Sequence, residues 1–174
     1  MKPLAPAADK GRWMTPIKTH PLTAAAFAPF GDVLDATGEF RLINEGMCQR
    51  HHDRAKLDFG PEGRAGISIF NAEARALPYE FSLVERHPEG SQAFVPMSEH
   101  PFLVIVAPDE GGTPGTPRAF VTNGAQGINF HRGTWHGVLT PLHAPGLFAV
   151  IDRIGTTANL EEYRYAQAWR VIGA

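Results

Sequence analysis

Apolar and polar side chains alternate in Phe81-Ser82-Leu83-Val84-Glu85-Arg86-His87. An alternation with a period of two is typical of a β-strand that buries one face and turns the other toward solvent. The same pattern recurs in Gly66-Ile67-Ser68-Ile69-Phe70. An uninterrupted apolar run, Phe102 to Ala107, is expected of a strand that is buried on both faces. These segments predict a protein built mainly from short strands.

Glycine and proline are frequent and are spread along the chain, with 18 Gly and 15 Pro among 174 residues. This density of helix breakers disfavours long helices but allows short strands joined by turns. Further strands are expected at Arg118–Val121, Ile128–Phe130 and Leu147–Ile151, and residues 108–117 are expected to form a loop. The pattern predicts an all-β barrel or sandwich. A small barrel with an open mouth would offer a pocket for a small ligand.

Two segments carry helix signals. Thr23 can cap a short helix at Leu22–Phe30, where three alanines follow the cap. Near the end of the chain, helix-forming residues predict a second helix within Asn159–Trp169. Residues 1–15 are rich in Ala, Pro and Lys without a periodic pattern, so we expect a flexible N-terminal extension followed by a single domain over residues 16–174.

Composition narrows the class of protein and its partners. The formal net charge is −2 and the pI is near 6.4, which argues against nucleic acid or an anionic membrane as the main partner. The single cysteine, Cys48, excludes an intrachain disulfide framework. The N-terminus lacks the apolar segment of a secretory signal, so a cytoplasmic protein is expected. The sequence also lacks a phosphate-binding glycine loop, a dinucleotide fingerprint and a Gly-x-Ser-x-Gly elbow.

The densest polar cluster surrounds the end of the first strand quoted above. Residues two apart on a strand share a face, so Glu85 and His87 point the same way and Arg86 points opposite. After a turn at residues 88–90, Gln92 can return to that face. Imidazole, carboxylate and amide ligands together suit a divalent cation such as Zn, Ni, Mn or Fe. The alternative is an exposed strand edge with a surface ion pair.

A second cluster contains two histidines on either side of Gly133. If the chain turns at this glycine, His136 begins a returning strand that can face the same pocket as Glu85. His131 can then lie at the rim as a proton carrier, because the unperturbed pKa of histidine is near neutrality. The alternative is that one or both histidines are structural residues beside Trp135.

Three further polar positions are candidates for binding a substrate. Arg50 and His52 would share one face of a strand, and an arginine at a barrel mouth can clamp a carboxylate; the alternative is a solvated loop. Asp152 directly follows an apolar strand and either closes the pocket or forms a surface pair with Arg153. For Asn123, which precedes a glycine, a tight turn is the favoured interpretation and a contact with a ligand is the alternative.

The two histidine-containing clusters resemble the two halves of a cupin site. The cupin pattern has His-x-His and a later Glu, followed further on by Gly-x-x-His. In this sequence Glu85-x-His87 and Gln92 stand at the first half, with Glu in place of the first His and Gln in place of the Glu. Gly133-Thr134-Trp135-His136 matches the second half.

Over roughly residues 15–160, the chain resembles the ureidoglycolate lyase family of allantoin and purine catabolism. The resemblance is carried by these segments: Arg50-His51-His52-Asp53, Glu85-Arg86-His87-Pro88, Asn129-Phe130-His131-Arg132, Trp135-His136 and Ile151-Asp152-Arg153. It implies a cupin-like β-barrel or jelly roll, usually a homodimer, that releases urea from (S)-ureidoglycolate and leaves glyoxylate. A divalent metal, nickel in particular, is associated with this activity.

The resemblance and the clusters together suggest a role for each candidate residue. The metal ligands would be Glu85, His87, Gln92 and His136. The catalytic residues would be Glu85 and His131, with His52 as the alternative to His131 as proton carrier. The substrate-binding residues would be Arg50, Asn123 and Asp152. Two alternatives remain open at this point, namely another metal-dependent cupin enzyme and a cupin that binds a small molecule without consuming it. A hydrolase acting on the same substrate would release ammonia and carbon dioxide instead of intact urea.

Overall fold

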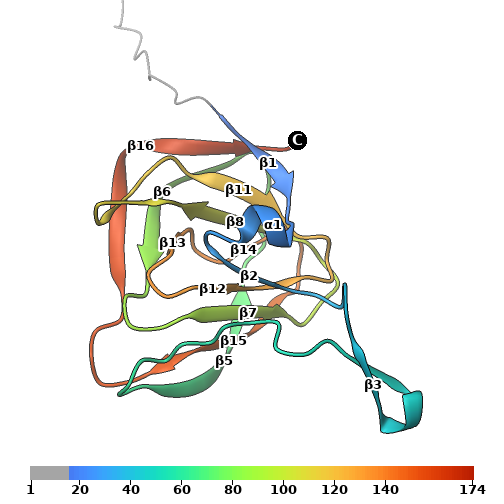
Figure 1. The fold of residues 1–174 in the computed structure, drawn as a ribbon. Helices are drawn as coiled ribbons and strands as arrows, with labels where there is room; N and C mark the ends of the chain where they lie inside the picture. The colour runs from blue at the N-terminus through green and yellow to red at the C-terminus, as the bar shows by residue number, and fades with distance from the viewer. Residues whose placement is uncertain (1–15) are drawn as a thin grey trace, which may run out of the picture.

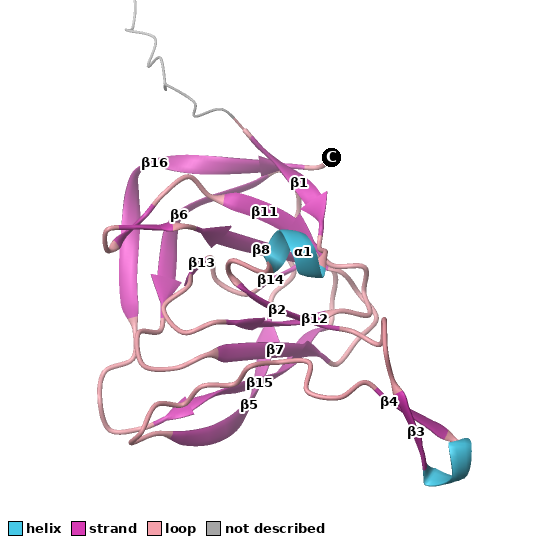
Figure 2. Ribbon diagram, in the orientation of Figure 1, coloured by secondary structure: helices cyan, strands magenta, loops and turns pink. Residues whose placement is uncertain are grey.

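A computed structural model describes residues 16–174, and the extension expected at residues 1–15 lies outside the described residues. Figures 1 and 2 show that most of the described chain is in strands. Residues 16–174 also contain one short α-helix and one 3₁₀ turn. The elements in chain order are β1 (Ile17–Pro21), α1 (Ala24–Phe27), β2 (Gly31–Leu34), β3 (Arg41–Ile43), η1 (Asn44–Gly46), β4 (Cys48–Arg50), β5 (Arg64–Ala72), β6 (Tyr79–Arg86), β7 (Gln92–Pro96), β8 (Phe102–Ala107), β9 (Asp109–Glu110), β10 (Thr113–Pro114), β11 (Arg118–Val121), β12 (Gly127–Phe130), β13 (Trp135–His136), β14 (Thr140–Pro141), β15 (Gly146–Ile154) and β16 (Glu161–Ile172).

One sheet closes on itself. Its strands follow the order β11, β1, β16, β6, β13 and β8, and β8 pairs again with β11. The strand β14 extends from β8 outside this ring. Closure leaves the six ring strands paired on both sides, which removes exposed edges. The predicted β-rich barrel is confirmed.

A second sheet has the order β2-β12-β7-β15-β5 and packs against the barrel. Between the two sheets lies a core of aromatic and branched side chains, in which Phe27, Phe130 and Phe148 are almost completely buried. Burial of such side chains is the main source of stability in a small domain. Among the described residues, no helix is long and apolar enough to cross a membrane.

Most of the predicted strands are present. The apolar run at 102–107 forms β8 with all six residues buried, and Arg118–Val121 forms β11 with the predicted bounds. The strands predicted at 66–70, 81–87 and 147–151 appear as β5, β6 and β15, of which β5 and β15 are longer than expected. The capped helix is confirmed as α1, a single turn in which the Thr23 side chain accepts a hydrogen bond from the backbone N–H of Ala26.

The helix predicted within Asn159–Trp169 is wrong, because this segment belongs to the long strand β16. Half-buried Tyr163 and Tyr165 alternate with exposed neighbours, and Trp169 and Val171 resume the alternation after a register shift. Pairing along β6 satisfies the backbone and overrides the helix propensity of the intervening residues. Residues 108–117 also differ from the expected loop, since they contain the short hairpin β9–β10.

Candidate active site

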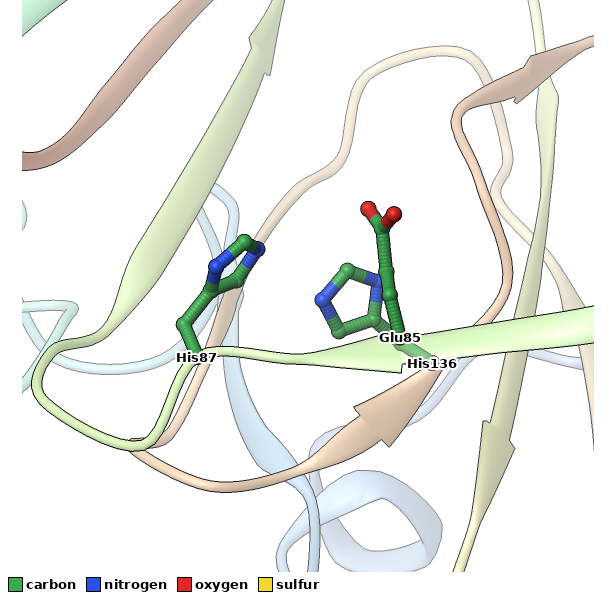
Figure 3. A group of neighbouring side chains, drawn as sticks. All are labelled: Glu85, His87 and His136. Carbon is green, nitrogen blue, oxygen red and sulfur yellow. The ribbon is translucent and has the colours of Figure 1, made fainter. Parts of the chain in front are cut away.

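Three predicted ligands meet between the closed ring and the second sheet. Glu85 lies on β6, His87 follows the end of this strand, and His136 lies on β13 (Figure 3). Glu85 and His136 are directly opposite each other in the β6–β13 pairing, so their side chains emerge on the same face. One ligand atom from each of the three residues lies within 4.8 Å of the others. The period-two pattern and the glycine turn therefore predicted this juxtaposition correctly.

His136 is held as a neutral imidazole. Its side chain is fully buried and stacks on the Phe130 ring, with the centroids 4.2 Å apart. Desolvation by this burial, helped by the nearby His87, lowers the pKa of His136 to about 3. Its Nδ1 lies 3.0 Å from the carbonyl oxygen of Gly137, and because a carbonyl only accepts, Nδ1 carries the hydrogen. The other nitrogen, Nε2, is left with a free lone pair.

The imidazole of His87 also has one nitrogen bound to a backbone carbonyl and one nitrogen free. Its Nδ1 lies 2.6 Å from the carbonyl oxygen of Asn159 and therefore donates the hydrogen bond. The Nε2 atoms of His87 and His136 are both buried without a hydrogen-bond partner. A backbone carbonyl on one ring nitrogen is a common way to orient a histidine that binds a metal through the other.

Glu85 is half-buried, and its surroundings shift its pKa. Burial is the largest effect and raises the pKa of Glu85 above its ordinary value. The nearby carboxylate of Glu162 raises it further, whereas His87 opposes the shift. Glu162 was missed by the sequence analysis because it lies on β16, the segment predicted as a helix; it is opposite Glu85 in the β6–β16 pairing.

Gln92 and Asp152 approach the same interior from the second sheet. The residues Phe130, Gln92 and Asp152 are opposite one another across β12, β7 and β15, so their side chains share a face. Since the Phe130 ring stacks on His136, this face is the one turned toward the three ligands. Gln92 Nε2 donates to Asp152 Oδ2 at 3.4 Å. Gln92 Oε1 and Asp152 Oδ1 are buried without a partner.

Four residues around one interior thus carry a buried polar atom without a hydrogen bond: His87, Gln92, His136 and Asp152. Buried polar atoms in proteins are nearly always paired, and unpaired ones indicate an absent water, ion or ligand. Two imidazoles and a carboxylate, with an amide oxygen nearby, fit a divalent metal ion of intermediate softness. The donor set therefore fits the metal that the sequence implied.

His131 lies away from this group. It follows β12, and its Nε2 is 3.0 Å from Oδ1 of Asp32 on the neighbouring strand β2. Asp32 is opposite Asn129 in the β2–β12 pairing and accepts a hydrogen bond from its side chain. Asn129 and Phe130 are adjacent on β12 and face opposite sides of the sheet. The His131–Asp32 pair is therefore on the outer side, and the role of His131 as proton carrier stays a prediction.

The remaining three candidates also lie outside the interior. Arg50 ends β4 and His52 follows it, in a hairpin that projects from the barrel (Figures 1 and 2). Asn123 follows β11, and Val121 of β11 is opposite Leu103 at the start of β8. His136 is opposite Val106, near the end of β8. Asn123 and His136 are therefore at different ends of this strand. The Asn123 side chain caps its own turn by accepting from the backbone N–H of Ala125. A single copy of the chain therefore does not bring these residues to the three ligands.

Comparisons with a family model and with known proteins point to the same enzyme family. A family model described as ureidoglycolate lyase matches residues 14–172. A ureidoglycolate lyase of Rhodobacter capsulatus is 60% identical over 151 residues, which cover 86% of this chain and 94% of that protein. A ureidoglycolate lyase of Chelativorans is 49% identical over 160 residues, covering 91% and 97%. Ureidoglycolate lyase 2 of Rhizobium meliloti is 47% identical over 160 residues, covering 91% and 98%.

Proposed function

The chain belongs to the ureidoglycolate lyase family of enzymes, and we propose that it cleaves (S)-ureidoglycolate to glyoxylate and urea in allantoin catabolism. The observation that supports this reaction most directly is the interior lined by Glu85, His87 and His136. Unpaired buried polar atoms lie on four residues around it, namely His87, His136, Gln92 and Asp152. We further propose that the enzyme acts in the cytoplasm as a homodimer.

The chemistry of the substrate sets three requirements. One carbon carries a hydroxyl, a carboxylate and a urea nitrogen, so cleavage needs a base for the hydroxyl proton and an acid for the departing nitrogen. It also needs stabilisation of the charge that develops at the forming carbonyl. No covalent nucleophile is required, and the exposed Cys48 lies on the projecting hairpin, not in the interior.

Glu85, His87 and His136 are the residues that would hold a divalent ion, with Gln92 Oε1 as the proposed fourth ligand. When bound, such an ion, for which we propose nickel, supplies positive charge that lowers the pKa of a coordinated hydroxyl. The backbone carbonyls of Asn159 and Gly137 keep both imidazoles in the tautomer whose Nε2 faces the interior.

The remaining groups act on the substrate itself. We propose that Glu85 also takes the hydroxyl proton, because it is the one carboxylate among the three residues of the triad and has a second oxygen beside the one that would hold the ion. The free Oδ1 of Asp152 is an acceptor suited to an N–H of the urea group, and the hydrogen bond from Gln92 fixes its orientation. His131 is not part of this proton path, since it lies on the outer side of the sheet.

The variant Glu85→Gln tests this proposal against a control on the same strand. Glu80 lies on β6 as well, but it is exposed and faces Arg170. We expect Glu85→Gln to lower kcat for glyoxylate release by about 10²–10⁴-fold, and Glu80→Gln to leave it within about twofold. Wild-type turnover by Glu85→Gln would remove this residue from the mechanism. Absence of glyoxylate release by the folded, metal-loaded wild-type protein would overturn the proposed reaction.

A further inference from the structure

The hairpin β3–β4 projects from the barrel as an arm, which we define as residues 36–54 (Figures 1 and 2). Its two strands have three residues each, and within residues 16–174 they pair only with each other. An isolated two-stranded hairpin is only marginally stable in water. The arm is therefore expected to rest on another surface in the working protein.

The arm has a basic face. Arg41 and Arg50 are directly opposite each other in the β3–β4 pairing and share that face. Together with Glu39, Phe40, His52 and Arg54 they line one pocket, in which three arginines outnumber one carboxylate. Arg54 pairs with Asp35 at the base of the arm, but no ion pair within the described chain involves Arg41 or Arg50. Unpaired arginines in a pocket are suited to bind a carboxylate through two parallel hydrogen bonds.

The arm also exposes apolar side chains. Phe40 is 49% exposed, Leu42 58% and Met47 87%. Leu42 is adjacent to Arg41 on β3 and so points to the opposite face. A second exposed apolar surface lies on the sheet, where Ile67 is 75% and Ile69 is 60% exposed. Both are on β5, an edge strand, and exposed apolar side chains on an edge usually mark a contact surface.

The active site, in turn, has no basic side chain placed to bind the substrate carboxylate beside the proposed metal ion. The side chains that face its interior include the carboxyls of Glu85, Asp152 and Glu162, with no lysine or arginine among them in the described chain. Two arginines beside these positions are occupied elsewhere. Arg86 binds Asp109 and Glu161, and Arg153 binds Glu89.

We propose that the arm of one copy places Arg50 and His52 at the active site of a second copy. Arg50 would bind the substrate carboxylate, and His52 would donate the proton to the departing urea nitrogen. The proposal rests on the proposed function, because that reaction supplies the carboxylate and the leaving nitrogen. The basic face of the arm complements the acidic interior, and Ile67 and Ile69 on the outer face of β5 offer a further exposed apolar surface for the second copy. In a twofold dimer the exchange is reciprocal, so both sites are completed.

Mixing two inactive variants tests this exchange. One partner is Glu85→Gln, which has a defective site and an intact arm; the other is the double variant Arg50→Ala with His52→Ala, which has an intact site and a defective arm. In a heterodimer the intact arm meets the intact site once. After subunit exchange of an equimolar mixture, half of the dimers are mixed and each has one working site of two, so we expect about a quarter of wild-type activity. A mixture as inactive as its components would overturn the proposal.

Single variants measure how much Arg50 contributes to substrate binding. Arg50→Ala is expected to raise KM about 10- to 100-fold, the effect of losing a charged hydrogen bond. Arg75→Ala, an exposed arginine outside the arm, is expected to leave KM unchanged. Equal effects of the two variants would count against a role for Arg50 in binding.

A readout independent of turnover separates this proposal from the proposed function. Cys48 on β4 is the only cysteine and is exposed, so Glu162→Cys places a second thiol at the proposed docking site. A short bifunctional thiol reagent should convert this variant into a covalent dimer, and the same variant carrying Cys48→Ser should stay monomeric on a denaturing gel. Cross-linked monomers alone, or dimers formed equally without Cys48, would overturn the exchange even if the protein proves to be an active lyase. If covalent dimers form only when Cys48 is present but the protein has no lyase activity, the arm exchange is supported and only the proposed reaction is refuted.

Discussion

Both imidazoles of the active site have one nitrogen committed to a backbone carbonyl and one facing the interior. His87 donates to the carbonyl of Asn159 and His136 to that of Gly137. Burial keeps His136 neutral, with its pKa lowered to about 3. A neutral histidine with a free Nε2 is the form that binds a metal, so the local contacts prepare both side chains for one role.

Metal binding should therefore depend on His136. We expect His136→Ala to reduce the bound metal from about one ion per chain to a small fraction, because two protein ligands hold a divalent ion much more weakly than three. The control is His100→Ala, since His100 is exposed and its ring lies beside that of His143 instead of facing the interior. Elemental analysis of the dialysed proteins checks this. Full metal content in His136→Ala would place the metal elsewhere.

His131 tests the distinction between a catalytic and a structural histidine. Its contact with Asp32 lies on the outer side of the sheet, where Asp32 also accepts from the backbone N–H of Lys56. We expect His131→Ala to lower the free energy of unfolding by about 1–3 kcal/mol and to change kcat by less than about tenfold. Urea unfolding and steady-state kinetics measure both. A loss of about 10²–10⁴-fold in kcat with unchanged stability would instead make His131 the proton carrier.

The candidate ligands could be predicted at the residue scale because strand geometry is local. Period-two alternation places Glu85 and His87 on one face whatever the rest of the chain does. The partner of His131 could not be predicted, since Asp32 is brought to it by the pairing of β2 with β12, far apart in the sequence. Glu162 was hidden for a related reason, because its position depends on pairing with β6.

At the scale of the element, β16 shows where local signals fail. Its residues favour a helix one by one, but the strand is stabilised by cross-strand packing of Tyr163, Tyr165 and Trp169 around the register shift. In contrast, β8 was predicted with its correct bounds, since a continuous apolar run is expected only where both faces are covered. Elements that carry their own pattern are predictable, and elements defined by a neighbour are not.

The base of the arm contains a carboxylate that should make stability depend on pH. Burial alone would raise the pKa of Asp35, but hydrogen bonds from Thr37 and Gln126 outweigh it. The charge of Arg54 adds to their effect, so the pKa lies below its ordinary value of 3.8. The unfolded chain therefore binds this proton more readily. The contribution of Asp35 is complete above about pH 3.8 and is lost as the pH falls through the folded-state pKa.

The variant Asp35→Asn checks this sign. At neutral pH we expect it to unfold at a lower urea concentration than the wild-type protein, and we expect the difference to shrink as the pH falls below 3.8. Glu73→Gln, an exposed carboxylate, serves as the control and should follow the wild-type profile. A difference that stays constant down to the acid transition would show that Asp35 acts through packing instead of charge.

At the scale of the whole molecule, the sequence predicted a β-barrel but not which strands pair to close it. Turn residues at short intervals indicate a barrel or sandwich, yet the pairing of β8 with both β13 and β11 depends on contacts between distant segments. The candidate active site also depends on contacts between segments that are distant in the sequence. Glu85 and His87 come from one strand, whereas His136, Gln92 and Asp152 arrive from three others in two sheets. The arrangement as a whole is that of an enzyme whose interior is lined by both sheets and, in our proposal, completed by the arm of a second copy.

The proposed lyase reaction is tested most directly by the balance of products that the metal-loaded wild-type protein forms from (S)-ureidoglycolate, with glyoxylate, urea and ammonia measured in the same sample. We expect equal amounts of glyoxylate and urea without ammonia, because a lyase leaves the urea group intact. Ammonia in place of urea would contradict it by showing a hydrolase, and binding of the substrate without any glyoxylate would contradict it by showing a binding protein.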